Sequence, residues 1–174
     1  MRIGLGFDSH PLVEGRALVL GAVEIPFPEG LLGHSDGDVV LHALCDAFLG
    51  SAGLGDIGEH FPDTDPTYMG AKSTLFLERC LEMLQERHLK PSSIDINIFA
   101  DAPRLGPWKS AIRKRLSALL KLPEGRINVK AKTLEGFPLF LNLPRSGGTV
   151  PSSFPISAPR LIAAEAVALV DEEP

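Results

Sequence analysis

Two residues near the start of the chain have the types and spacing of metal ligands. Asp8 and His10 stand two apart in an alternating segment, so their side chains would project from the same face of a strand. A carboxylate and an imidazole both suit zinc or a similar divalent ion, and a third ligand must come from elsewhere. Because D-x-H pairs are more often surface or capping pairs, the spacing alone leaves both interpretations open.

A candidate third ligand lies in HSDGDVVLHALCDA, residues 34–47. There Asp38, His42 and Asp46 are spaced by four and would share one face of a helix. Such a row is typical either of a solvent-exposed face with salt bridges or of an inward polar stripe. Two histidines and one carboxylate would leave one tetrahedral position open, which is the pattern of a catalytic rather than a structural zinc site.

Glycines favour the inward interpretation. Gly4 and Gly6 occupy the same face of the predicted strand as Asp8 and His10. Because they carry no side chains, we expect open space on that face through which another group could approach the two ligands.

Hydrophobic periodicity predicts the elements that must position these residues. Alternation indicates strands over 2–10, 94–99 and 127–132, and an apolar run indicates a hairpin or neighbouring strand at 17–26. Helices are predicted over 36–50, over roughly 69–88 and from about 107, the first with Ser35 or Asp36 as N-cap and Gly50 as its end. The run at 161–170 has an ambiguous period and is interpreted as a buried strand that completes the sheet.

This order indicates an α+β fold, an α/β sandwich in which helices pack on one face of a mixed β-sheet. A length of 174 residues suits the single domain that we expect over 1–174. Residues 138–160 hold five prolines without a period and are interpreted as an atypical proline-rich loop. A frameshift or engineered scar there is an alternative that would leave the catalytic half untouched.

Composition excludes several classes of function. A formal net charge of −5 gives no general attraction to nucleic acid or to an anionic membrane surface. No segment has the apolar length that a bilayer span needs, and the N-terminus lacks the pattern of a signal peptide. Cys45 and Cys80 have no disulfide or zinc-knuckle spacing, so we expect reduced core thiols in a cytoplasmic protein.

Several long motifs, in order, resemble one enzyme family. GFDSH at 6–10, GLLGHSDGDVVLHAL at 30–44, GLGDIGEHFPDTDP at 53–66 and KTLEG at 132–136 are similar to those of the 2-C-methyl-D-erythritol 2,4-cyclodiphosphate synthases. The resemblance covers about 1–136 and resumes at 161–170. It implies a phosphorus–oxygen lyase of the methylerythritol phosphate route, which supplies isoprenoid precursors. Such an enzyme converts 4-diphosphocytidyl-2-C-methyl-D-erythritol 2-phosphate into the cyclic diphosphate and releases CMP.

The resemblance also assigns roles to residues. Asp8, His10 and His42 would hold Zn²⁺ or another divalent transition metal, and Glu135 would help to hold a second ion, Mg²⁺ or Mn²⁺. His34 and Thr133 would aid the transition state. The implied substrate-binding residues are Ser9, Ser35, Asp56, Ile57, Gly58, Phe61, Pro62, Asp63, Thr64, Asp65, Ala100, Asp101, Ala102, Pro103, Arg104, Leu105, Gly106, Lys132 and Leu134. Without the resemblance, Ser35 is more simply an ordinary N-cap and Glu135 a solvated turn residue, and the aspartates of 56–65 are typical turn formers.

The family is a homotrimer whose three sites lie between subunits, with the zinc side on one chain and the cytidine side on its neighbour. This sequence departs from the family after Gly136, where G-x-G-R-G-E-G usually precedes the last strand, and Arg145 would replace the usual arginine. Two other functions stay open: a zinc and nucleotide-binding protein that docks a pathway enzyme through 138–160, and a metal phosphohydrolase that activates water.

Overall fold

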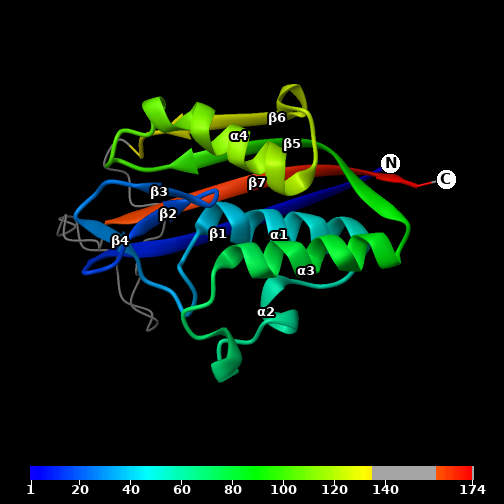
Figure 1. Cartoon of the computed structure of the whole chain (residues 1–174), viewed down its shortest axis with the longest axis horizontal. Coiled ribbons are helices and arrows are strands. Elements are labelled where there is room, and N and C mark those ends of the chain that lie inside the picture. The colour runs from blue at the N-terminus through cyan, green and yellow to red at the C-terminus, as the bar shows by residue number, and fades with distance from the viewer. Residues whose placement is uncertain (135–159, 174) are drawn as a thin grey trace, which may run out of the picture.

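A five-stranded mixed sheet forms the frame of the molecule (Figure 1). The computed structural model describes residues 1–134 and 160–173, so the predictions for Glu135, Arg145 and the 138–160 loop lie outside the described residues. β1 runs antiparallel to β4 and β7, β7 runs antiparallel to β5, and β5 runs parallel to β6. The spatial order is β4(Glu29–Leu31), β1(Arg2–Glu14), β7(Leu161–Glu172), β5(Leu89–Phe99) and β6(Ile127–Lys132).

Helices pack on one face of this sheet, as predicted (Figure 1). α1 lies on β1 and β7 with α3 packed beside it, while α4 lies near β6. The helices are α1(Val39–Ala52), α2(Ile57–His60), α3(Ser73–Glu86) and α4(Lys109–Leu120), with 3₁₀ turns at Pro66–Tyr68, Gly106–Trp108 and Glu124–Arg126. None of these helices, within the described ranges, combines the length and apolar character that crossing a bilayer requires.

Residues 161–170 form the central strand of the sheet, which confirms the prediction of a buried strand. Its small side chains explain how the helices come so close: Ala164, Ala166 and Ala168 are fully buried. α1 is therefore enclosed between the sheet and α3, and most of its residues are buried. A predominantly apolar helix of this kind, buried on most sides, is typical of a core position.

The space expected beside Gly4 and Gly6 is filled by α1, which is the element that approaches Asp8. A Cβ on Gly4 would lie 1.7 Å from the carbonyl oxygen of Ala47, and one on Gly6 would lie 2.0 Å from that of Ala43. The absent side chains thus let the helix backbone approach the strand directly. This contact brings α1, with His42, against the strand that carries Asp8.

Several element boundaries differ from the predictions: β1 and β5 are longer than the predicted strands, and the helices and the hairpin differ as well. α1 begins after Asp38 rather than at Ser35 or Asp36, and it ends at Gly53, whose left-handed backbone closes it, rather than at Gly50. α3 is shorter than the predicted 69–88. The segment 17–26 is a self-contained hairpin of β2(Leu18–Leu20) and β3(Val23–Ile25), outside the main sheet.

The face of β1 opposite the helices is apolar and exposed. Ile3, Leu5 and Phe7 alternate with the buried glycines and are 67%, 63% and 39% exposed. Large side chains grouped in this way on one strand are typical of a surface that is covered in an assembly.

Candidate metal centre and pocket

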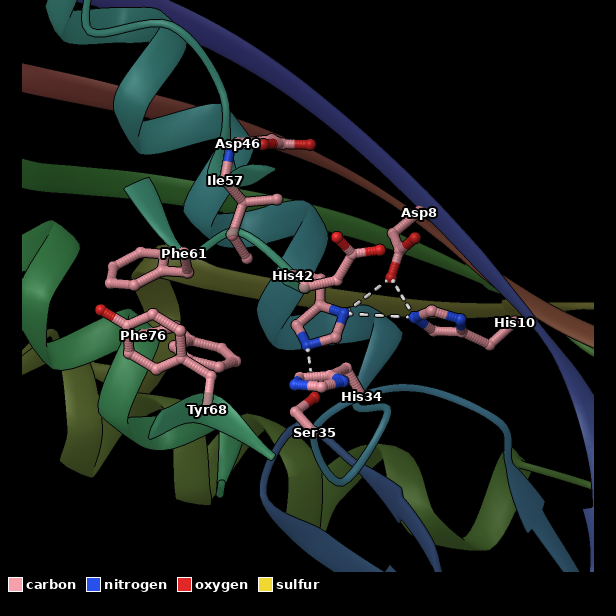
Figure 2. A pocket seen from close by; sticks show the side chains of 11 residues that line it. Asp8, His10, His34, Ser35, His42, Asp46, Ile57, Phe61, Tyr68 and Phe76 are labelled. Carbon is pink, nitrogen blue, oxygen red and sulfur yellow. Dashed lines mark hydrogen bonds and ion pairs between the residues drawn. The ribbon is translucent and has the colours of Figure 1, made fainter. Parts of the chain in front are cut away.

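Asp8, His10 and His42 converge at one point although the last is distant in sequence (Figure 2). Asp8 Oδ2 lies 2.8 Å from His42 Nδ1 and 3.1 Å from His10 Nε2, and the two nitrogens are 3.4 Å apart. Ligand atoms bound to one tetrahedral zinc ion lie roughly 3.3 Å from one another. The three donor atoms would therefore fit such an ion if the shortest of their separations, between Asp8 and His42, lengthened by about half an ångström.

The start of α1 is set by Asp38, which places His42 one turn into the helix. The Asp38 carboxylate accepts hydrogen bonds from the amides of Val40 and Leu41, and also from Gly21 and Ala22 in the turn of the β2–β3 hairpin. One buried side chain thus caps the helix and attaches the hairpin to it. Complete burial raises the pKa of Asp38 to about 6, against the lowering effect of the hairpin amides.

The charges of the triad depend on one another. Burial disfavours the charged form of Asp8, but its hydrogen bonds to His10 and His42 hold the pKa of the carboxyl well below its usual range. Burial likewise disfavours the imidazolium of His42, yet the hydrogen bond and negative charge of Asp8 raise the pKa of that ring above its ordinary value. Negative charge is therefore concentrated where a cation would sit.

The triad forms one end of a cavity of about 280 Å³. Figure 2 shows an aromatic wall of Phe61, Tyr68 and Phe76 facing the polar end, where His42 and His34 lie. Among the residues that the structure describes, the lining is Asp8, His10, His34, Ser35, His42, Asp46, Ile57, Phe61, Asp63, Tyr68 and Phe76. Carboxylates outnumber fixed cations along this lining, so an anionic ligand would need added positive charge.

His34 offers an unused polar atom. Its Nε2 is buried and has no hydrogen-bond partner among the described residues. Buried polar atoms are nearly always paired in folded proteins, so such an atom beside a cavity suggests a ligand contact. The backbone around it is braced, because Arg16 donates to the carbonyl oxygen of Ser35 and the Gly70 amide donates to that of His34.

The predicted site residues fall into two groups in space. The triad, His34, Ser35, Ile57, Phe61 and Asp63 share the cavity, and α2, which the sequence did not predict, carries part of this group. Residues of 100–106 meet those of 132–134 instead: the Ala100 amide donates to Lys132, and the Leu134 amide to the Asp101 carboxylate. This second group contributes nothing to the lining of the cavity.

Several residues predicted to bind substrate, among them Asp56 and Asp65, lie beside the cavity rather than on its lining. Asp56 caps α2 through the Glu59 amide, and Asp65 accepts from the Thr67 amide, so both make the local turns expected of aspartates. Sequence reasoning missed Tyr68 and Phe76 as lining residues. Their only signal was aromatic character, which does not distinguish a pocket wall from a core.

The row Asp38, His42 and Asp46 is an inward polar stripe rather than a solvent face. Asp38 and His42 are buried, and Asp46 accepts a hydrogen bond of 2.8 Å from the Ile57 amide while lining the cavity. Burial raises the pKa of Asp46 above its ordinary value. Asp46 thus joins α1 to the loop that closes the other side of the pocket.

A mixed sheet covered on one face by helices, with a carboxylate and two imidazoles converging at a pocket, defines an α+β protein with a possible metal centre. The profile of the YgbB family matches residues 1–142. The chain belongs to this family.

Two relatives illustrate how similar the chain is to named enzymes. The chain is 52% identical over 136 residues to the 2-C-methyl-D-erythritol 2,4-cyclodiphosphate synthase of Clostridium perfringens, covering 78% of this chain and 87% of that protein. It is 53% identical over 137 residues to the synthase of the same name from Aquifex aeolicus, covering 79% and 88%. The motif resemblance seen in the sequence is confirmed.

Solved structures of similar proteins agree with the fold. A 2C-methyl-D-erythritol-2,4-cyclodiphosphate synthase in its CDP-bound form matches with a TM-score of 0.82 and 42% identity, over 98% of this chain and all of that one. The bifunctional IspDF of Campylobacter jejuni matches with a TM-score of 0.84 and 36% identity, over 98% of this chain and 42% of that protein.

Proposed function

We propose that the chain converts 4-diphosphocytidyl-2-C-methyl-D-erythritol 2-phosphate into 2-C-methyl-D-erythritol 2,4-cyclodiphosphate and CMP. The observation that carries this proposal is the convergence of Asp8, His10 and His42 at the end of a cavity, in a chain about half identical to synthases of that name. In the reaction a 2-phosphate oxygen bonds to the β-phosphorus, and the bond from that phosphorus to CMP breaks. The enzyme is therefore a lyase of isoprenoid precursor synthesis.

The donor set supports Zn²⁺ as the ion of the triad. Two imidazoles and one carboxylate are ligands that suit zinc, and a fourth position would stay open for a phosphate oxygen. When bound, the ion would neutralise negative charge on the two phosphate groups that must approach each other. Asp8 supplies the charge that attracts the ion, and His10 and His42 fix where it sits.

His34 and Ser35 would contact the substrate phosphates. The unpaired Nε2 of His34 is a buried polar atom at the cavity, and it can donate to phosphate when it carries the proton. The aromatic wall of Phe61, Tyr68 and Phe76 would exclude water from the reacting groups. The loop of 56–65 would hold the methylerythritol part through its carboxylates and amides.

Glu135 would help to hold a second ion, Mg²⁺ or Mn²⁺, which would supply positive charge to the diphosphate. This assignment rests on the family motif at 132–136, because Glu135 lies outside the described residues. Hard carboxylate and phosphate oxygens are the ligands that such ions prefer. Thr133, next to this position, would contact the transferred phosphoryl group.

Each complete site would lie between two subunits of a homotrimer. The residues of 100–106 and 132–134, which resemble the cytidine side, meet each other but do not line the cavity of the same chain. The exposed apolar row of Ile3, Leu5 and Phe7 supports an assembly, since burial of these side chains would favour association. A neighbouring chain would then bring its nucleotide loops to the zinc side of this one.

The protein would act in the cytoplasm. Both cysteines are free and buried, which fits a reducing compartment.

Product analysis of purified protein with the substrate, Zn²⁺ and Mg²⁺ tests the proposal. We expect CMP and the cyclic diphosphate in equal amounts. Linear phosphate products would indicate the phosphohydrolase instead, and the absence of turnover would favour a binding protein that docks a pathway partner. His42→Ala is the matched control for activity that depends on the triad.

A further inference from the structure

A line of hydrogen bonds leads away from the triad on the far side of His42. While Nδ1 of His42 faces Asp8, its Nε2 lies 2.9 Å from Ser73 Oγ and 3.2 Å from Ser35 Oγ. Ser73 Oγ lies 2.5 Å from Asp36 Oδ1. Ser73 is completely buried, so this line is shielded from water at its centre.

The direction of each bond follows from counting protons. A carboxylate oxygen only accepts, so the single hydroxyl proton of Ser73 points to Asp36 in the shortest contact of the line. Ser73 Oγ can then only accept from the ring at 2.9 Å. Two acceptors at that separation would repel, so Nε2 of His42 carries a proton.

The other contacts of these residues fix the same arrangement. Asp36 Oδ1 also accepts from the amides of Ser73 and Asp38, which locks the carboxylate against the starts of α3 and α1. Ser35 Oγ accepts from the Gly37 amide, and its own proton can point to Ser73 Oγ at 3.3 Å. Among the described residues, every hydroxyl and amide proton near His42 Nε2 can therefore point to another acceptor, so none of them needs Nε2 as its acceptor.

We propose that Ser73 and Asp36 are positioning residues that hold His42 as an Nδ1 metal ligand, through the relay from His42 Nε2–H to Ser73 Oγ–H to Asp36. With a proton held on Nε2, Nδ1 is the ring nitrogen that faces Asp8 and His10. A bound cation would take the place of the proton that Nδ1 shares with Asp8 in the metal-free protein. The relay also fixes the plane of the ring, because both its ends are attached to helix starts. Outer-sphere partners of metal-bound histidines act in this way in other metal sites.

This inference deepens the proposed function, because it rests on the triad being the zinc site. Zinc affinity, measured by competition with a chromophoric chelator, is the main test. Removal of an outer-sphere partner weakens metal binding by roughly 10- to 100-fold, and we expect this loss for Ser73→Ala and for Asp36→Ala. Asp36→Asn keeps an oxygen that accepts from Ser73 and should lose less than Asp36→Ala.

A matched control separates the relay from general damage to the core. Ser51 is also a buried serine, and its hydroxyl donates to the Phe48 carbonyl within α1, away from the triad. Ser51→Ala should keep the zinc affinity of the wild type. If Ser73→Ala does not fold, the Asp36 variants carry the test, since Asp36 is only partly buried.

Nitrogen NMR of zinc-loaded protein labelled with ¹⁵N-histidine gives a second readout that a purely structural role would not move. We expect a protected Nε2–H resonance for His42 that exchanges faster in Ser73→Ala and is unchanged in Ser51→Ala. An unprotonated Nε2, or wild-type zinc affinity in the folded Ser73 and Asp36 variants, would overturn the relay. If the wild type itself fails to bind zinc, the metal site of the proposed function fails instead.

Discussion

The carbonyl oxygen of Ala47 in α1 lies 1.7 Å from the point that a Cβ on Gly4 would occupy. Strand and helix backbones therefore touch where a side chain would otherwise stand. We expect Gly4→Ala to lower the free energy of unfolding by about 3 kcal/mol or more. This is the upper end of the cost of overpacking a core, and it applies here because the backbone itself must move. Urea unfolding at fixed protein concentration measures it.

Gly50, which lies on α1 like Ala47, provides the control for Gly4→Ala. A Cβ there meets nothing within 4 Å, and the residue is helical and exposed. Gly50→Ala should raise the free energy of unfolding by about 0.5–1 kcal/mol, since alanine favours helix over glycine. Equal effects of the two substitutions would show that the contact with Ala47 does not limit the packing.

His42→Ala should remove zinc and almost all turnover. The substitution deletes one of three ligands and leaves Asp8 and His10 with incomplete coordination. The fall in zinc affinity should exceed the roughly 100-fold that loss of an outer-sphere partner causes. Metal analysis after dialysis and the rate of CMP release test this together; a folded, zinc-free variant with full activity would refute the role of the ion.

For Glu135→Gln we expect a larger fall in rate than in zinc content. The glutamate is proposed to serve the second ion, whereas the zinc ligands are elsewhere in the chain. The amide keeps the shape of the side chain but removes the charge that a hard divalent ion prefers. Turnover should need more Mg²⁺ than in the wild type, and an unaltered Mg²⁺ dependence would argue against the assignment.

The interaction between Asp8 and His42 should make the stability of the zinc-free protein depend on pH. The pKa of Asp8 is lowered on folding, so its contribution is present above the ordinary value of 3.8 and is lost as pH falls through the folded value. The pKa of His42 is raised, so its contribution is complete below 6.5 and is lost as pH rises through the folded value.

Between 3.8 and 6.5, both contributions stabilise the zinc-free protein. A double-mutant cycle of Asp8→Ala and His42→Ala, followed by urea unfolding with a chelator present, isolates the coupling energy. We expect the largest coupling inside this interval and a decline at alkaline pH. A coupling that stays constant well above pH 6.5 would contradict the charge interaction.

Leu5→Lys should shift the proposed trimer towards monomer. Leu5 is 63% exposed in the centre of the apolar row on β1, where an ammonium group would stay hydrated and oppose association. Leu75, 49% exposed on α3, is the control because it lies on the helical side of the molecule. Sedimentation should detect dissociation for Leu5→Lys alone; equal masses for both variants would exclude the β1 face.

Periodicity predicted most of the sheet and three of the helices. Ile94, Ile96 and Ile98 repeat at every second residue, which only a strand satisfies, whereas the leucines of α3 repeat at the three- to four-residue spacing of a helix. It misplaced the start of α1, since Ser35, Asp36 and Asp38 are all good caps. The choice between them depends on the hairpin amides of Gly21 and Ala22, which only the fold brings to Asp38.

The triad was predictable in kind, since two of its ligands share a strand face. The helix that packs against Gly4 and Gly6 could not be predicted, because a strand face without side chains can accommodate either a ligand or a helix. Ser73 gave no signal either: a serine at the start of a helix is ordinary in sequence. Only its position between His42 and Asp36 gives it a role.

The central position of β7 means that the sheet can be completed only at the end of translation. This strand is made after every other described element, yet it lies between β1 and β5 and pairs with both. Until it leaves the ribosome, the long edges of β1 and β5 have no partner, and unpaired edges invite association with other chains. The N-terminal ligands are therefore translated early but reach their final setting only when the last strand joins the sheet.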